Sequence, residues 1–491
     1  MTLKVGAYVT GGTVAALETF ETLVGRKQDF FVFFKAFTES WNAALCQSLI
    51  DRGTIPILTC QPDGYYLDDI TDGLMDAYIA ARIAEIKTVD GSVWLRLMHE
   101  MNGTWYDWGW GKSDNTPTKY IAAWKYIVDK FRVASVTNVE WLFCPNHNGK
   151  DLDAGNDWGA NSIPAYYPGS GYVDILGLDG YNLATENWRS FRGIFDSTYR
   201  GSAYDVMTAL HPTADLHIVE TASVETALSA GIKASWIADF YNRAAYSGNY
   251  PRIKGICWFN QTTSAYKVDS TAGALAAFKV HMANLDKHIS VVYANSTDGH
   301  VERWAGDTVW ATARGAATGS DDSITGDHLH TRAYKSGAAF IVSRAIMPFT
   351  TALPGGAAVI EATLSMATYE IVTSGDAIVA CLTDLLGITD DGTWTEYAIA
   401  HYTTECGRLT SAAAVGYQNR VTINTNVFTI PSAGTFAIGL RAGKDFDNTE
   451  PTDGSYASIS SAGTDLDEKA PFITLAYEIS EPCRRFRHNA W

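Results

Sequence analysis

Two glutamates, Glu100 and Glu220, are the residues whose type and setting best suit chemistry. Each follows a short apolar run, in WLRLMHE and LHIVE respectively. Two carboxyl groups about 5–5.5 Å apart can cleave a glycosidic bond with retention: one attacks the anomeric carbon while the other protonates the leaving oxygen. The two groups need different pKa values, because the acid must hold its proton while the nucleophile is ionised. Either glutamate alone would be interpreted as a surface carboxylate, but the pair favours catalysis.

The neighbours of these glutamates suit the same chemistry. Arg96 precedes Glu100 by four residues, and its fixed charge can hold a carboxylate in the anionic form. The chain has 15 Trp and 25 Tyr, whose rings can stack on sugars or simply fill a core. Asn146, in the segment FCPN, can either cap the loop that follows or bind a sugar hydroxyl, and the sequence leaves both options open.

The elements that must position these residues are eight apolar runs in the first part of the chain. They are nearly continuous in apolar character, as expected of parallel strands buried on both faces, and amphipathic segments separate them. Eight βα units in a row predict an α/β fold, a (β/α)₈ TIM barrel, in which catalytic residues lie where strands end. An open doubly wound sheet is the alternative, but no GxGxxG follows the first run. The runs cover residues 3–9, 30–37, 54–60, 92–100, 139–146, 173–182, 216–223 and 253–260.

From about residue 290 the sequence changes character. Short alternating runs rich in Gly, Ala, Ser and Thr are separated by turn residues, which predicts an all-β sandwich or jelly-roll domain. We therefore expect a catalytic barrel over residues 1–287 and an accessory domain over residues 288–491. Carbohydrate binding, attachment to a larger assembly and a spacer role all remain open for the second domain. Three of its tryptophans can form a sugar platform or pack in its core: Trp304, Trp310 and Trp394.

Composition narrows the choice of partner. Lys and Arg number 37 against 54 Asp and Glu, which gives a formal net charge of −17 and disfavours nucleic acid. No run of about 18 apolar residues predicts a membrane span. The seven cysteines show no metal-binding spacing, although a Cys406–Cys483 disulfide stays open. The acidic stretch 445–454 offers oxygen ligands for calcium, but a plain turn is the simpler interpretation. We expect no metal and no cofactor.

Several segments of the first part of the chain resemble a known family. The segment WLRLMHEMNGTWYDWGWG (94–111) is similar to the acid/base segment of glycoside hydrolase family 26, a clan A family known mainly for endo-β-1,4-mannanases. Four further segments agree in order and spacing, so the resemblance covers nearly all of residues 1–285. They are FCPNHN (143–148), YYPGSGYVDILGLDGYN (166–182), IVETAS (218–223) and ICWFN (256–260).

The resemblance implies roles for individual residues. Glu100 matches the acid/base of the family and Glu220 its nucleophile. Arg96 matches an arginine that buttresses the carboxylates, and His99 takes a place where an asparagine is common elsewhere in the clan. Four other positions match groups that contact the sugar or lie near the nucleophile. Trp105 matches a substrate-contacting tryptophan, Asp179 and Tyr181 lie near the nucleophile, and Trp258 matches the aromatic floor under the sugar at the cleavage point.

Together these observations predict a retaining endo-glycoside hydrolase that acts on a polysaccharide, first of all β-1,4-mannan. The family also contains enzymes that cleave β-1,3-1,4-glucan and β-1,3-xylan, so both stay open. The N-terminus, MTLKVGAYVTGG, lacks the pattern of a signal peptide. We therefore expect either an extracellular enzyme whose leader is absent here or a virion-associated, phage tail depolymerase of a surface glycan. A non-catalytic glycan-binding protein is the remaining alternative.

Overall fold

The structure is a computed structural model of the 491-residue chain. It divides into two compact units, residues 1–245 with 249–286 and residues 246–248 with 287–491, and each is described by itself. The structure describes residues 3–479 apart from 113, 149–161, 184–188, 198–201, 226–231, 262–264, 295–298, 304–306, 308, 320, 324–327, 337, 373–377, 384, 386–397, 410–417, 452–455 and 461–470.

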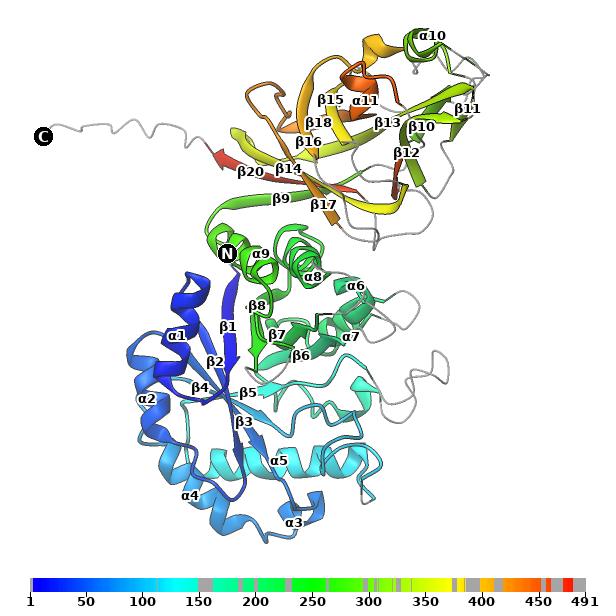
Figure 1. Ribbon diagram of the computed structural model, residues 1–491. Coiled ribbons are helices and arrows are strands. Elements are labelled where there is room, and N and C mark those ends of the chain that lie inside the picture. Colours follow the sequence, from blue (N-terminus) through cyan, green and yellow to red (C-terminus); the bar gives the residue numbers. More distant parts are fainter. Residues whose placement is uncertain are drawn as a thin grey trace, which may run out of the picture. The chain divides into compact units, whose positions relative to one another are not determined.

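The first unit is a closed barrel of eight parallel strands, which confirms the predicted fold class (Figure 1). The ring closes because β1 pairs with β2 on one side and with β8 on the other. Apolar side chains fill its interior, with Phe30, Ile57, Leu142 and Val219 among them. The strands are β1 (Lys4–Val9), β2 (Phe30–Ala36), β3 (Ile55–Gln61), β4 (Val93–Leu97), β5 (Val139–Phe143), β6 (Ile175–Asn182), β7 (Leu216–Ser223) and β8 (Ile253–Asn260).

Helices connect these strands and cover the outside of the ring. Several begin at a threonine whose hydroxyl accepts a hydrogen bond from a backbone N–H of the first turn: Thr13, Thr116 and Thr271. The helices are α1 (Val14–Val24), α2 (Ala43–Asp51), α3 (Leu67–Thr71), α4 (Asp76–Ile86), α5 (Pro117–Val133), η2 (Ile163–Tyr166), α6 (Phe191–Phe195), α7 (Ala203–Leu210), α8 (Ile232–Tyr241), η3 (Asn242–Tyr246) and α9 (Ala272–Asn284).

The second unit is built from antiparallel strands, as the all-β prediction requires. Its main path runs in the order β16-β15-β18-β13-β12-β19-β14-β20-β9. The strands are β9 (His288–Tyr293), β10 (Gly299–Arg303), β11 (Asp321–Ser323), β12 (His328–Ser336), β13 (Ala339–Ala352), β14 (Ala357–Val372), β15 (Ile378–Leu382), β16 (Glu405–Leu409), β17 (Gln418–Ile423), β18 (Ala433–Ala442), β19 (Tyr456–Ser460) and β20 (Phe472–Ile479). Short helices interrupt them at α10 (Trp310–Gly315), η5 (Ile399–His401) and α11 (Gly443–Phe446).

Alternate residues of β13 serve two separate apolar cores. Met347 and Phe349 belong to one core, whereas Val342 and Ile346 belong to the other. This alternation is the pattern that the short alternating runs predicted, because successive side chains of a strand point to opposite faces. In the part of the chain that the structure describes, no helix is long and apolar enough to cross a membrane.

Candidate active site

The site begins with two carboxylates on neighbouring strands. Asp179 on β6 lies directly opposite Glu220 on β7, and the register of the pair shifts just before them. A second shift separates β7 from β8 between Ile218 and Thr221. Both shifts indicate an extra residue in β7, a β-bulge, and bulges re-aim side chains at the rims of barrels. Val219 therefore packs in the barrel interior while the next side chain, Glu220, reaches the groups at the mouth.

Arg96 on β4 connects these carboxylates. One terminal nitrogen, Nη1, donates to both oxygens of Asp179 at 2.9 and 3.1 Å, and the other, Nη2, donates to Glu220. Its Nε donates to Thr59 Oγ1 at 2.8 Å, so the guanidinium is fixed in its plane. Arg96 and Asp179 are fully buried. This placement agrees with the buttressing role that the family resemblance implied for Arg96.

Glu100 lies three residues beyond the end of β4, in a turn rather than in the strand. Met98 and Glu100 have φ values of 46° and 52°, in the left-handed region. Such residues cost on the order of 1–3 kcal/mol each and cluster at active sites. Their backbone nitrogens still bond to the neighbouring strands, Met98 to Cys60 O at 3.0 Å and Glu100 to Cys144 O at 2.9 Å. The strained turn thus stays attached to the barrel and aims Glu100 at its mouth.

The carboxyl group of Glu100 accepts two hydrogen bonds from neutral donors. Trp105 Nε1 donates to Oε2 at 2.6 Å, and Asn146 Nδ2 donates to Oε1 at 2.7 Å. Burial and the nearby charge of Glu220 raise the pKa of Glu100 to about 7, although these two donors and Arg96 act against the rise. Glu220 instead accepts from the Arg96 cation and from the hydroxyl of Tyr181. The two glutamates are therefore close enough to interact but have unlike partners.

The balance of charge explains why a proton is retained. Three carboxyl groups, Glu100, Asp179 and Glu220, share one cation, Arg96. Ionising all three would leave two uncompensated buried negative charges, which a low-dielectric site resists. Burial also raises the pKa of Asp179, with a further contribution from Glu220. Asp179 has the bidentate contact with Arg96, so Glu100, bound only by neutral donors, is the group best placed to keep the proton.

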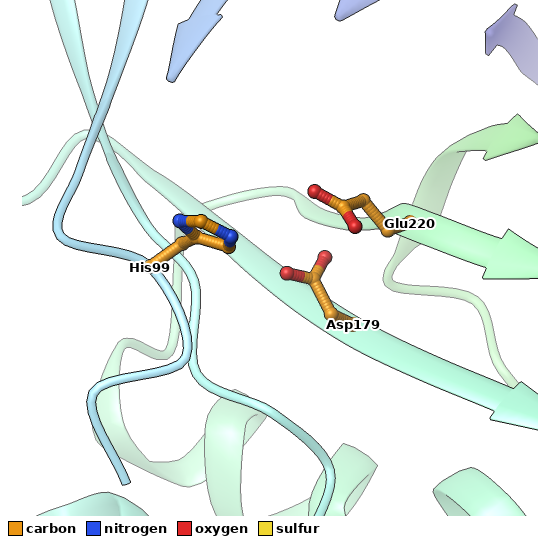
Figure 2. A group of neighbouring side chains, drawn as sticks. All are labelled: His99, Asp179 and Glu220. Atoms are coloured by element: carbon orange, nitrogen blue, oxygen red, sulfur yellow. The ribbon is translucent and has the colours of Figure 1, made fainter. Parts of the chain in front are cut away.

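His99 completes the buried cluster. One of its ring nitrogens and one oxygen each of Asp179 and Glu220 lie within 4.8 Å of one another, and the three side chains point toward a common centre (Figure 2). Burial and the Arg96 charge lower the pKa of His99, so its ring is neutral. Its Nε2 lies 3.0 Å from the Tyr106 hydroxyl. Arg96 already pairs with both carboxylates, so we still expect no bound metal here.

The segment after Glu100 contains two residues whose roles the sequence reasoning missed. The side chain of Asn102 ties this turn to the β5 loop, because its Nδ2 donates to the carbonyl oxygens of Asn146 and Asn148 at 2.8 and 3.0 Å. A Cβ atom at Gly103 would lie 2.3 Å from the Trp105 ring. Only glycine therefore leaves room for the indole that contacts Glu100. The short motif MNG, which precedes Trp105, is the sequence signal from which these two roles could have been predicted.

Of the two uses that the sequence left open for Asn146, the structure shows the loop-capping one. Its Oδ1 accepts from the backbone N–H of Asn148 at 2.8 Å, which is the loop-capping role. Its Nδ2, however, donates to Glu100 rather than to solvent. The loop is held beside β6 by a parallel bridge between Asn146 and Asp179. Asn146 is thus a partner of the acid/base candidate.

The prediction for Trp258 was wrong. This side chain is fully buried and packs against Trp236 and Phe278, which lie on the helices outside the barrel. It therefore cannot form the floor under a sugar. Side chains alternate along a strand, so the next residue, Phe259, faces the barrel mouth instead. Phe259 stacks on Tyr8 with ring centroids 4.4 Å apart and meets Tyr181 edge-on at 5.8 Å.

An aromatic wall beside Glu220 was also missed from the sequence. It consists of the rings of Phe34, Tyr8, Phe259, Tyr181 and Tyr266, and each ring in this order contacts the next. Glu220 is close enough to raise the pKa of the Tyr8 hydroxyl, in addition to the larger effect of burial. Trp105, which donates a hydrogen bond to Glu100, is 51% exposed. Both surfaces offer rings of the kind on which sugars stack.

The remaining sequence expectations fall in the second unit. Trp310 is a buried member of one of its cores and so is no sugar platform. Asp445, in the stretch considered for calcium, is fully buried against Arg344 and Arg441. Asp447 pairs with Arg408, so arginines occupy these carboxylates. Trp304, Trp394 and Cys483 lie outside the described residues.

Comparison with known proteins shows that part of the chain is similar to glycoside hydrolases. Residues 63–250 match the family model for glycosyl hydrolase family 26. The chain is 34% identical over 284 residues to Endoglucanase H of Acetivibrio thermocellus, a match that covers 56% of this chain and 30% of that protein. It is 31% identical over 137 residues to a mannan endo-1,4-β-mannosidase of Bacillus subtilis, covering 27% of this chain and 31% of that one. The chain thus spans about a third of the length of these relatives.

Solved structures also show similarity to part of the chain. GH26C from Muricauda sp. has a TM-score of 0.44 at 17% identity and covers 57% of this chain and 85% of that one. A GH26 β-mannanase from Bacteroides ovatus has a TM-score of 0.42 at 14% identity, covering 58% and 88%. The family match extends from the β3 loop through β7 and contains Arg96, Glu100, Asp179 and Glu220. Within the barrel, residues 63–250 are thus similar to glycoside hydrolase family 26.

Proposed function

We propose that this protein is a retaining endo-glycoside hydrolase that cleaves a β-linked polysaccharide. Glu220 is the nucleophile and Glu100 the acid/base. The observation that supports this proposal most strongly is the unequal environment of the two glutamates. Glu220 is held by a buried cation and a hydroxyl donor, whereas Glu100 has only neutral donors and a pKa raised to about 7. Such a pair separates the ionised nucleophile from the protonated acid.

The reaction then follows in two displacements. A Glu220 oxygen attacks the anomeric carbon while the bond to the leaving sugar breaks, and the proton of Glu100 moves to the departing oxygen. The covalent glycosyl-enzyme leaves Glu100 ionised, so that it can take a proton from a water molecule, which attacks the same carbon and frees Glu220. Arg96 pairs with the Glu220 carboxylate before the first step, and it does so again when cleavage of the glycosyl ester frees that carboxylate.

Azide distinguishes the two roles. Glu100→Ala with azide should give a glycosyl azide of retained configuration, because the nucleophile still forms the covalent intermediate. Glu220→Ala with azide should give the inverted azide, because azide then attacks the anomeric carbon directly from the vacated side. Without azide, each variant should lose about 10²–10⁴-fold or more of its turnover. Glu140→Ala is the matched control, since Glu140 lies near the start of β5, at the opposite end of the barrel. Wild-type turnover in both active-site variants would end the proposal.

Mannan is the substrate that the family resemblance favours, and several relatives bear the name of mannan endo-1,4-β-mannosidase. A β-glucan is the second candidate, because the match to Endoglucanase H is twice as long as the match to the Bacillus subtilis mannosidase. Product analysis on mannan, β-1,3-1,4-glucan and β-1,3-xylan decides between them. Internal cleavage shows as oligosaccharides of mixed length, and β products before mutarotation show retention. Binding without cleavage on all three would instead favour a glycan-binding protein.

A further inference from the structure

The loop between β8 and α9 is held from outside the barrel mouth by three side chains. Lys233 on α8 donates to Ala265 O at 2.7 Å, to Lys267 O at 2.6 Å and to Ser270 Oγ at 3.0 Å. Trp258 Nε1 donates to Tyr266 O at 2.9 Å, and Asn260 Oδ1 accepts from the Val268 N–H at 2.8 Å. Five atoms of one short segment are thus fixed by three side chains.

Lys233 is an unusual residue to hold a loop, because its charged side chain is buried. Its side chain is fully buried and its ammonium lies 5.7 Å from the centre of the Trp258 ring. Among the residues that the structure describes, no carboxylate lies within salt-bridge distance of it, and the charged groups that affect its pKa are Glu225, Asp269 and Lys267. Burying an unpaired cation is unfavourable. An ammonium has three donors, however, and here three oxygens receive them, so the lysine suits the loop that it holds.

The loop carries a ring that belongs to the candidate site. Tyr266 lies 5.3 Å from Tyr181 and 6.3 Å from Phe259, measured between ring centroids. The Tyr181 hydroxyl in turn donates a hydrogen bond to Glu220. A chain of contacts therefore runs from Lys233 through the loop to Tyr266, then to Tyr181, and ends at the carboxylate that we assign as the nucleophile.

We propose that Lys233 is a positioning residue: its buried ammonium fixes the β8–α9 loop so that Tyr266 packs on Tyr181 and keeps the Tyr181 hydroxyl on Glu220. This inference rests on the proposed function of Glu220. A purely structural lysine would stabilise the fold equally at every step of the reaction. A positioning lysine should instead affect the reactivity of Glu220, and it should do so in a way that depends on its own charge.

The charge dependence has a simple origin. A neutral amine has two hydrogens, so it cannot donate to all three loop oxygens at once. Burial lowers the pKa of Lys233 to about 8, with Lys267 lowering it further and Glu225 and Asp269 opposing the change. We therefore expect the loop to lose one of its three bonds to Lys233 as the pH rises through about 8. Activity that depends on the Tyr181 hydroxyl should fall with it.

A dinitrophenyl β-glycoside of the cleaved sugar isolates this effect. Its leaving group needs no proton, so the ionisation of Glu100 no longer limits the first step. Wild-type kcat/KM should fall about 10-fold or more from pH 7 to pH 9.5, with a midpoint near 8. Lys233→Met should already be low at pH 7, by about 10- to 10²-fold, and should vary little with pH. Lys254→Met is the matched control, because Lys254 lies near the start of β8, at the opposite end of the strand, and should keep the wild-type profile.

Hydrogen exchange tests the anchoring without any substrate. The Val268 amide donates to Asn260, so it reports whether the loop is in place. It should exchange on the order of 10-fold faster in Lys233→Met than in Lys254→Met at the same pH. If Lys233→Met does not fold, Tyr266→Leu takes its place in the kinetic experiment. In that variant the fall in kcat/KM near pH 8 should disappear. Unchanged exchange at Val268, or a Lys233→Met or Tyr266→Leu enzyme with the wild-type rate and profile, overturns the inference. A wild-type enzyme inactive on every glycoside counts against the proposed function instead.

Discussion

Each unit of the protein buries a cluster of arginine and carboxylate, and the two clusters have opposite charge balance. In the barrel, Arg96 faces Asp179 and Glu220, with Glu100 nearby. In the second unit, Asp445 faces Arg344 and Arg441, and the spare donors of both arginines reach backbone carbonyl oxygens. The barrel cluster has more carboxyls than cations, and the other has more cations than carboxyls.

The difference shows what a buried charge cluster can be used for. The two arginines lower the pKa of Asp445 to about 2 despite its burial, so its proton is gone at any ordinary pH. With one cation among three carboxyls, the barrel cluster keeps a proton that can move near neutral pH. A surplus of arginine fixes one structure, whereas a surplus of carboxylate leaves a group that can act as an acid. The variants below test this contrast, from the largest expected effect to the smallest.

Removing the arginine of the barrel cluster should have the largest effect on activity. In Arg96→Met, Glu220 loses the buried cation that binds and orients its carboxylate, so kcat/KM should fall about 10³-fold or more. Arg96→Lys should lose less, because it keeps the charge but not the bidentate geometry. Arg344→Met is the matched change in the second unit and should leave turnover per folded molecule unaltered. Equal losses in Arg96→Met and Arg344→Met would contradict the contrast.

Removing the carboxylate of the other cluster should affect stability instead. Asp445→Asn leaves Arg344 and Arg441 without their buried partner, which should lower the free energy of unfolding of the second unit by about 3–5 kcal/mol. Because the folded pKa of Asp445 lies below its unfolded value, the stabilisation is present above about pH 4 and is lost as the pH falls toward about 2. Denaturant unfolding of wild type and variant at pH 7 and pH 3 measures this. The difference between the two proteins should shrink at the lower pH; a constant difference would rule out this linkage.

A smaller effect should follow from removing one neutral donor of Glu100. The Asn146 amide stabilises the ionised form of Glu100. Asn146→Ala should therefore raise the pKa of Glu100 and move the alkaline limb of kcat/KM upward by up to about 1 pH unit. Asn138→Ala removes an amide that bonds to Ile86 O and Val89 O instead, and it should leave the limb where it is. A downward shift in Asn146→Ala would show that another group controls the limb.

Much of this architecture follows from the sequence because its signals are repeated. Eight buried apolar runs predict the barrel, and the alternating runs after residue 290 predict the antiparallel unit. The segment 94–111 places Glu100 in a recognisable context, and the register of β6 and β7 then brings Asp179 beside Glu220. What the sequence does not contain is the bulge in β7 or the left-handed backbone at Met98 and Glu100. Both depend on pairing between strands far apart in the chain.

The error at Trp258 has the same physical origin. One residue decides which face of β8 a side chain occupies, and a continuously apolar strand gives no alternation from which to read it. Phe259 therefore lies in the mouth and Trp258 among the helices. Lys233 was missed for a different reason: a lysine in an amphipathic helix is normally solvated. Only the tertiary structure shows that three oxygens of a distant loop surround it.

The most direct test of the central claim is a carboxyl titration of Glu100 by ¹³C NMR, in the wild-type protein and in Glu220→Gln. If the two side chains share one site, neutralising position 220 removes a charge that raises the pKa of Glu100. The pKa should then fall clearly from about 7 toward the ordinary value of a glutamate. An unchanged titration of Glu100 in Glu220→Gln would contradict the account, because two groups that do not affect each other's proton cannot be acting on one sugar.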